Sequence, residues 1–133
     1  MSLLSIAILA TALSPQAVQS LEEEVVVLGE QLDKGRVRAG SRDGEFYCEV
    51  RESTDDPDLN RIMCEGMKHC SAYNAELYAT YEKQLAARST RDAARQQMNA
   101  AMTQCFTTAY DRLVANLAEQ RWQAKQAQQG EAE

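Results

Sequence analysis

One short segment of the chain gathers side chains that can bind soft metals. The sequence Met63-Cys-Glu-Gly-Met-Lys-His-Cys70 carries two thioethers, two thiols and one imidazole. Such ligands suit Cu(I), although the spacing matches no standard zinc site. At helical periodicity Met63, Met67 and Cys70 share one face, and His69 points about 120° away from it. Methionine commonly fills protein cores, so we expect core residues here, with no metal ligands and no cofactor; copper binding is our third functional hypothesis.

The chain lacks an obvious set of catalytic residues. His69 is its single histidine, so any Ser-His-Asp or Cys-His site would have to use it. Cysteines held in disulfides are not nucleophiles, and no pair of carboxylates stands out from the scattered acidic residues. Gly35, Gly40 and Gly44 are predicted to be turn residues and not a phosphate-binding loop. We therefore predict that the protein is not an enzyme.

Composition limits the class of protein further. The chain has 133 residues, of which 44% are apolar and 26% charged, with a net charge of -6. This length indicates one domain at most. The acidic balance would repel phosphates and argues against nucleic-acid binding. Four cysteines, an even number, favour folding in an oxidising compartment.

The beginning of the chain is typical of a secretory signal peptide. Residues 1–20 contain no charged side chain, and an apolar run covers residues 3–13. Ser20 is small enough for the last position before a cleavage site, so we expect a mature protein that starts near Leu21. The alternative is an ordinary apolar N-terminal helix, because the run is too short to span a bilayer. We predict a periplasmic or secreted protein whose mature chain has no transmembrane segment.

The first part of the mature chain is predicted to form a small antiparallel β element over about residues 24–51. The β-branched run at residues 25–28 is expected to be an edge strand, and Asp43-Gly44 is a turn signal. Alternation of side chains between two faces then predicts a strand with one buried side. The residues expected on that side are Phe46, Cys48 and Val50.

A long helix is predicted next, over about residues 57–87. Asp56 can cap free backbone N–H groups, and Pro57 suits the first helical position. The spacing of the apolar residues that follow is close to a heptad repeat, which indicates a contact seam. The seam consists of Leu59, Met63, Met67, Cys70, Asn74, Leu77, Tyr81 and Leu85.

A second helix is predicted over about residues 89–125. Ser89 and Asp92 have the form of a capping box. The composition becomes rich in Gln, Ala and Glu beyond Glu119, so the single domain is expected to cover residues 21–119 and residues 120–133 to be a frayed polar tail. The contact face expected on this helix consists of Ala94, Met98, Ala101, Cys105, Ala109, Leu113 and Asn116.

The cysteine pairing follows from folding these two helices back on one another. With a bend near residues 87–89, residues whose numbers add up to about 175 lie at equal height, as Cys70 and Cys105 do. Cys64 is six residues from Cys70, about 9 Å along the axis, so these two cannot pair. Pairing Cys64 with Cys105 would need the same mismatch in height. We therefore predict Cys48–Cys64 and Cys70–Cys105 disulfides, each worth roughly 3–4 kcal/mol.

One stretch of the chain also has a recognisable pattern. The segment Cys48-x-Val50-x-x-Ser53-Thr54-x-x-Pro57-x-Leu59-Asn60-x-x-x-Cys64 resembles the strand-to-helix passage in the C-terminal domain of some TonB energy-transducing proteins. The resemblance implies a local strand, a capped helix and a Cys48–Cys64 bridge. The strand that follows in that family is missing here, so TonB activity is not implied. The layout as a whole resembles small exported alphaproteobacterial proteins with no assigned activity.

These expectations combine into one architecture and three functions. The fold is predicted to be α+β and mainly α, with a small N-terminal antiparallel β element followed by a disulfide-stapled antiparallel helical hairpin. We expect a non-enzymatic exported binding or scaffold module whose partner is an envelope protein or a second copy of the chain. The alternative is a holdase similar in outline to the Spy family of small helical periplasmic chaperones, because methionines offer adaptable apolar contacts.

Overall fold

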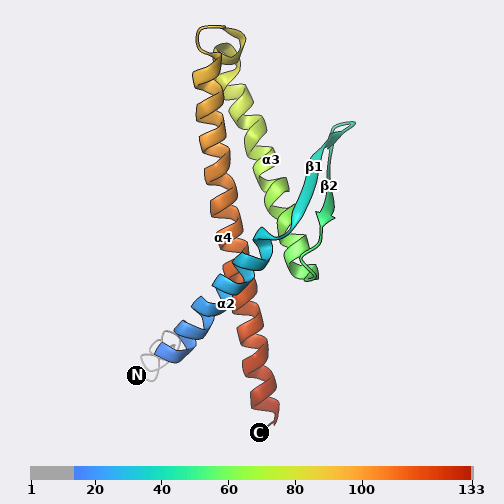
Figure 1. The fold of residues 1–133 in the computed structure, drawn as a ribbon, viewed down its shortest axis with the longest axis vertical. Helices are drawn as coiled ribbons and strands as arrows, with labels where there is room; N and C mark the ends of the chain where they lie inside the picture. Colours follow the sequence, from blue (N-terminus) through green and yellow to red (C-terminus); the bar gives the residue numbers. More distant parts are fainter. Residues whose placement is uncertain (1–13, 133) are drawn as a thin grey trace, which may run out of the picture.

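The computed structural model describes residues 14–132, and residues 1–13 of the expected signal peptide lie outside this range. The fold is α+β and mainly α, as predicted. A two-stranded antiparallel sheet precedes a pair of long antiparallel helices, and a first helix crosses α4 near its middle (Figure 1). The elements are α2 (Pro15–Asp33), β1 (Arg36–Arg42), β2 (Glu45–Glu52), α3 (Pro57–Ala86) and α4 (Arg91–Ala132).

The first helix corrects the predicted β element, because residues 24–28 belong to α2 and not to an edge strand. Ser14 caps α2 by accepting a hydrogen bond from the Ala17 N–H, and Pro15 occupies the first turn. Leu28 is buried, and Val25 and Leu32 pack against the same cluster. The spacing of these three residues is helical, so packing on the other helices outweighs the β preference of the valines.

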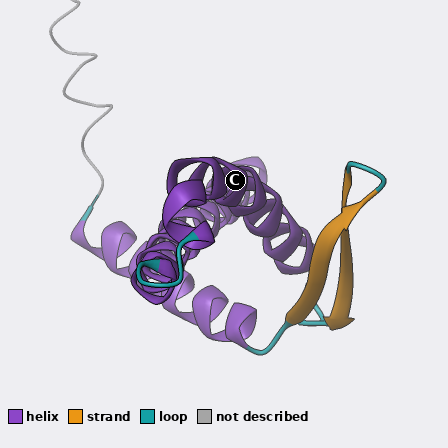
Figure 2. Cartoon of the chain, turned by 90° about the horizontal axis from the view of Figure 1, so that it is seen from above, coloured by secondary structure: helices purple, strands orange, loops and turns teal. Residues whose placement is uncertain are grey.

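The β element itself is a hairpin of β1 and β2, which stands beside α3 (Figure 2). Asp43 and Gly44 have φ angles of 53° and 81°, so both central residues of the turn are left-handed, as a type I′ hairpin turn requires. The predicted turn is therefore confirmed. Gly40 instead lies within β1 opposite Tyr47, and Val50 is 42% exposed, so neither residue has its expected role.

The start of α3 is as predicted. The Asp56 carboxylate accepts hydrogen bonds from the N–H groups of Asp58 and Leu59, and Pro57 is the first helical residue. The capping carboxylate also lies at the positive end of the helix dipole, which favours its charge.

The connection between the two long helices uses Thr90 and not the predicted cap, Ser89. The Thr90 hydroxyl donates to the carbonyl oxygen of Gln84 at 2.7 Å, and the Arg91 Nε donates to that of Leu85 at 2.9 Å. These bonds satisfy carbonyl groups at the end of α3 that have no partner within the helix. The next helix therefore starts at Arg91, two residues later than expected.

The second long helix also continues further than predicted. The expected frayed tail at residues 120–133 is helical through Ala132, so the predicted end near residue 125 is wrong as well. Ala and Gln are good helix formers, and Arg121 is held by ion pairs to the start of α3.

The main core lies where α2 crosses the start of α3 and the middle of α4 (Figure 1). Its buried members come from all three helices and are Leu28, Leu59, Ile62, Val114, Leu117 and Ala118. Above this crossing α3 and α4 lie side by side, and the β1–β2 hairpin stands beside α3 (Figure 1). That two-helix part, residues 66–86 of α3 with residues 91–109 of α4, is called the arm below.

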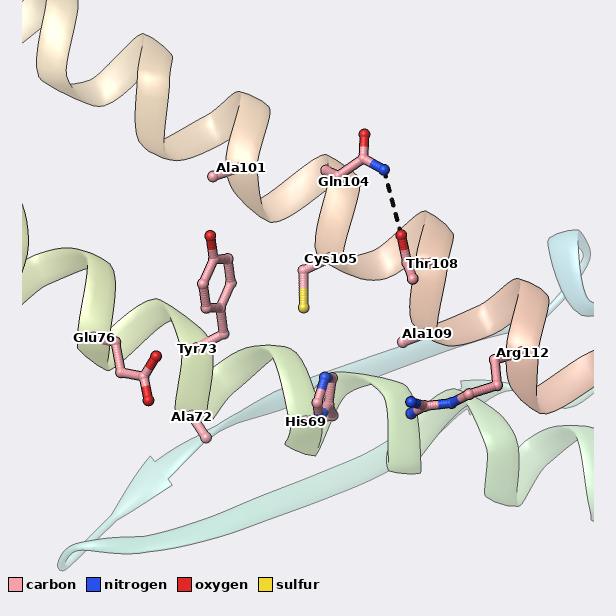
Figure 3. A pocket seen from close by; sticks show the side chains of 10 residues that line it. All are labelled: His69, Ala72, Tyr73, Glu76, Ala101, Gln104, Cys105, Thr108, Ala109 and Arg112. Atoms are coloured by element: carbon pink, nitrogen blue, oxygen red, sulfur yellow. Dashed lines mark hydrogen bonds between the residues drawn. The ribbon is translucent and has the colours of Figure 1, made fainter.

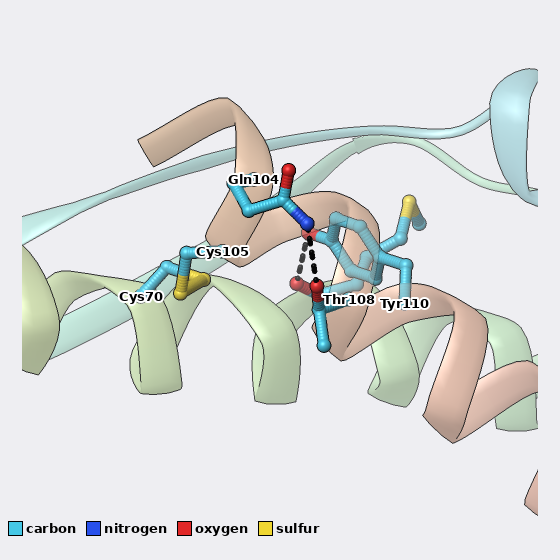
Figure 4. The surroundings of a disulfide bond; sticks show 6 residues. Cys70, Gln104, Cys105, Thr108 and Tyr110 are labelled. Atoms are coloured by element: carbon cyan, nitrogen blue, oxygen red, sulfur yellow. Dashed lines mark hydrogen bonds between the residues drawn. A yellow bond between two sulfur atoms is a disulfide. The ribbon is translucent and has the colours of Figure 1, made fainter. Parts of the chain in front are cut away.

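Both predicted disulfides are present. Cys48–Cys64 joins β2 to α3, with Cα atoms 5.8 Å apart. Cys70–Cys105 joins α3 to α4, with Cα atoms 5.9 Å apart, and forms a covalent rung at the base of the arm (Figure 4). Disulfides of this kind are typical of proteins that fold in an oxidising compartment.

Candidate functional site

A groove of about 630 Å³ lies between α3 and α4, beside the Cys70–Cys105 rung (Figure 3). Small residues from both helices, Ala72, Ala101 and Ala109, lie along it together with Cys105. Because most of the small side chains on this side, Ala101, Cys105 and Ala109, come from α4, the two helices leave a hollow that larger side chains would fill. We call this feature the rung groove.

The polar side chains of the rung groove are arranged by charge. Glu76 lies towards the end of the groove nearer the bend, whereas His69 and Arg112 lie on the other side of the rung (Figure 3). The Arg112 side chain starts on α4 and reaches towards α3. Tyr73 lies between these two ends and is 37% exposed. The groove therefore offers one aromatic surface between an acidic and a cationic end.

One wall of the rung groove is held by a side-chain hydrogen bond within α4. The Gln104 amide nitrogen donates to the Thr108 hydroxyl at 3.3 Å. Both side chains are exposed, so they can exchange this bond for one to a docked partner. Cys70 is fully buried, whereas Cys105 is partly exposed in the groove.

The segment with possible metal ligands is divided between core and surface. Met63 and Cys70 are buried, and Cys64 and Cys70 are each held in a disulfide. His69 is exposed and turned into the rung groove. Among the residues that the structure describes, no group of three or more His, Cys, Asp or Glu side chains is placed to hold a metal ion.

A close fit of α3 against α4 lies just below the rung. The ring of Tyr110 covers Gly66, and its hydroxyl donates to the Met63 carbonyl oxygen at 3.0 Å. Burial raises the pKa of Tyr110, so the phenol stays protonated as a hydrogen-bond donor. The sequence pattern did not single out Gly66, because a glycine in a helix offers no apolar signal.

Arg121 is a further structural residue that sequence reasoning missed, since it lies in the expected tail. Its Nη2 contacts Asp56 Oδ2 at 2.8 Å and Asp58 Oδ2 at 3.1 Å. Burial acts to raise the pKa of Asp56, but hydrogen bonds from Arg121 and from the amides of Asp58 and Leu59, with the Arg121 charge, lower it overall. The cluster ties α4 to the start of α3 and has no free group for chemistry.

The opposite side of the arm has a smaller hollow, of about 200 Å³. Tyr78 is 56% exposed there and lines a hollow with Leu85, Met98 and Met102. Arg95 and Asn99 border the same hollow from α4. Arg95 is the charged residue among those that line this hollow, which has no acidic side chain in its lining.

Comparisons with family models, curated proteins and solved structures found no match to this chain. Within residues 14–132, none of the helices is long and apolar enough to cross a membrane.

Proposed function

We propose that this protein is a non-enzymatic exported module that binds another protein through the rung groove. The observation that carries the proposal is the groove itself, which combines small residues, one exposed aromatic ring and separated charges on a covalently fixed helix pair. Aromatic anchors on rigid supports are the usual centres of protein interfaces.

The structure of α2 is compatible with export. Residues 14–20 are exposed except for half-buried Ala17, whereas the packed residues of α2 lie further along, at Val25 and Leu28. Cleavage after Ser20 would leave the packed part intact. Residues 22–24, all glutamates, would then form the first turn of the shortened helix, where acidic side chains are favoured by the helix dipole.

The chaperone alternative has less support. Met98 is only 6% exposed, and the rung limits how far the two helices can separate. A holdase needs adaptable exposed apolar surface, whereas the groove is small and fixed in shape.

Site-specific crosslinking in intact cells tests the proposed function. A photoreactive amino acid replaces Gln104 at the rung groove, and a control variant carries it at Asn99 on the opposite side of the arm. We expect a single adduct of defined mass from position 104 and none from position 99. Equal yields from both positions, or no adduct from position 104, would refute binding through this groove.

A further inference from the structure

We infer that the rung groove binds a second copy of this chain in a two-fold symmetric, antiparallel dimer. This inference rests on the proposed function, because the second copy is the partner that would bind the same groove. The helical pair buries one seam and leaves the groove side uncovered in the arm. Packing a second helical pair against this uncovered side gives a four-helix arrangement, which is a common way to bury the remaining exposed face of a helical pair.

The charges of the groove are placed as this symmetry demands. Cys70 and Cys105 are at equal height, so heights along both helices can be counted from the rung. Glu76 is six residues from Cys70, about 9 Å towards the bend, and Arg112 is seven residues from Cys105, about 10 Å in the other direction. The acidic and cationic groups therefore lie at nearly equal distances on opposite sides of the rung.

Consider a two-fold axis that is perpendicular to the helices and crosses both of them at the rung. Rotation about this axis places the Glu76 level of one copy at the Arg112 level of the other. With the axis in the interface plane, α3 faces α3 of the second copy and the two arms run antiparallel. Glu76 of one copy then lies level with Arg112 of the other. Since Arg112 reaches towards α3 (Figure 3), its guanidinium lies on the side where the opposing carboxylate arrives. Symmetry forms this pair twice.

The same axis fits the uncharged residues of the groove. Tyr73 is three residues from the rung, so it falls level with Thr108 and Ala109 of the second copy. The exposed ring is thus at the height of small side chains, and the alanines of the groove allow the helices to approach closely. A parallel arrangement would leave Glu76 level with Asn99 of the second copy and would lose the charge pairing.

The size of the surface predicts a weak dimer. The levels of Arg112 and Glu76 are about 20 Å apart, and two neighbouring helices are about 20 Å wide, which gives roughly 400 Å² per copy. Stable interfaces bury about 800 Å² per partner. The dimer should therefore form and dissociate with protein concentration, and should not be permanent.

Sedimentation equilibrium of the exported protein with its disulfides intact tests the inference. We expect the wild type to change from monomer to dimer as concentration rises. Glu76→Arg and Arg112→Glu should each weaken dimerisation at least about tenfold, because each creates two like-charge contacts, and the double reversal should restore it. Tyr73→Ala should also weaken it. The matched controls on the opposite side, Arg95→Glu and Tyr78→Ala, should leave it unchanged.

Several results would overturn the dimer. They are a wild type that stays monomeric at all concentrations, a double reversal that does not recover, and controls that weaken association as much as the groove variants. The proposed function has a separate outcome. If crosslinking at position 104 yields an adduct with a different protein while the purified chain is monomeric, the groove is a binding site but the second copy is not its partner.

Discussion

Gly66→Ala offers a sensitive test of how α3 and α4 fit together. A Cβ atom at Gly66 would lie 2.8 Å from Cζ and 2.9 Å from Cδ1 of the Tyr110 ring. The ring cannot move away freely, because its hydroxyl donates to the Met63 carbonyl oxygen. The substitution therefore forces either a shift of the helices or the loss of this partly buried hydrogen bond.

The expected magnitude comes from three opposing effects. Alanine favours a helix over glycine by about 1 kcal/mol. Overpacking of a filled site costs about 1–3 kcal/mol, and weakening the Tyr110 hydrogen bond costs about 1 kcal/mol more. We expect Gly66→Ala to lower the free energy of unfolding by about 1–3 kcal/mol.

Urea unfolding followed by circular dichroism measures this change. Gly29→Ala is the matched control, since Gly29 is also inside a helix but has nothing within 4 Å of the added Cβ. That control should raise the free energy of unfolding by up to about 1 kcal/mol. If Gly66→Ala stabilises the protein as much as Gly29→Ala does, the packing of Tyr110 over Gly66 is wrong.

Two further changes test other parts of the structure. Arg121→Met should lower the free energy of unfolding by about 1 kcal/mol at neutral pH. The pKa of Asp56 in the folded protein is below its usual 3.8. The ionised carboxylate therefore stabilises the fold above pH 3.8, and this stabilisation is lost as the pH falls through the lowered pKa. Urea midpoints should consequently fall less on acidification in Arg121→Met than in wild type. Removal of residues 1–20 should change the urea midpoint little, because α2 packs through later residues; a large loss would refute this.

The helical pair could be predicted from local signals. The Asp56-Pro57 cap and the apolar periodicity located α3, and the heights of Cys70 and Cys105 followed from the bend. The Asp43-Gly44 turn was also predictable, because its backbone requires left-handed residues. In each case the residue types themselves favour the observed structure.

The errors arise where tertiary contacts decide. The valines of α2 favour a strand locally, and only their packing against α3 and α4 selects the helix. Ile62 and Gly66 were missed because the seam of α3 was predicted from a heptad spacing. In the structure, buried residues recur every four positions from Ile62 to Cys70, as expected for helices that cross at an angle. The rung groove depends on Arg112 and Thr108, which have no pattern of their own in the sequence.

The central claim is that α3 and α4 are locked side by side at the rung. Peptide mapping of the non-reduced exported protein by mass spectrometry tests it most directly. We predict two linked peptide pairs, Cys48 with Cys64 and Cys70 with Cys105. Free thiols at Cys70 and Cys105, or a Cys64–Cys105 link, would contradict the placement of Cys70 opposite Cys105. The rung groove, which depends on that placement, would then be wrong as well.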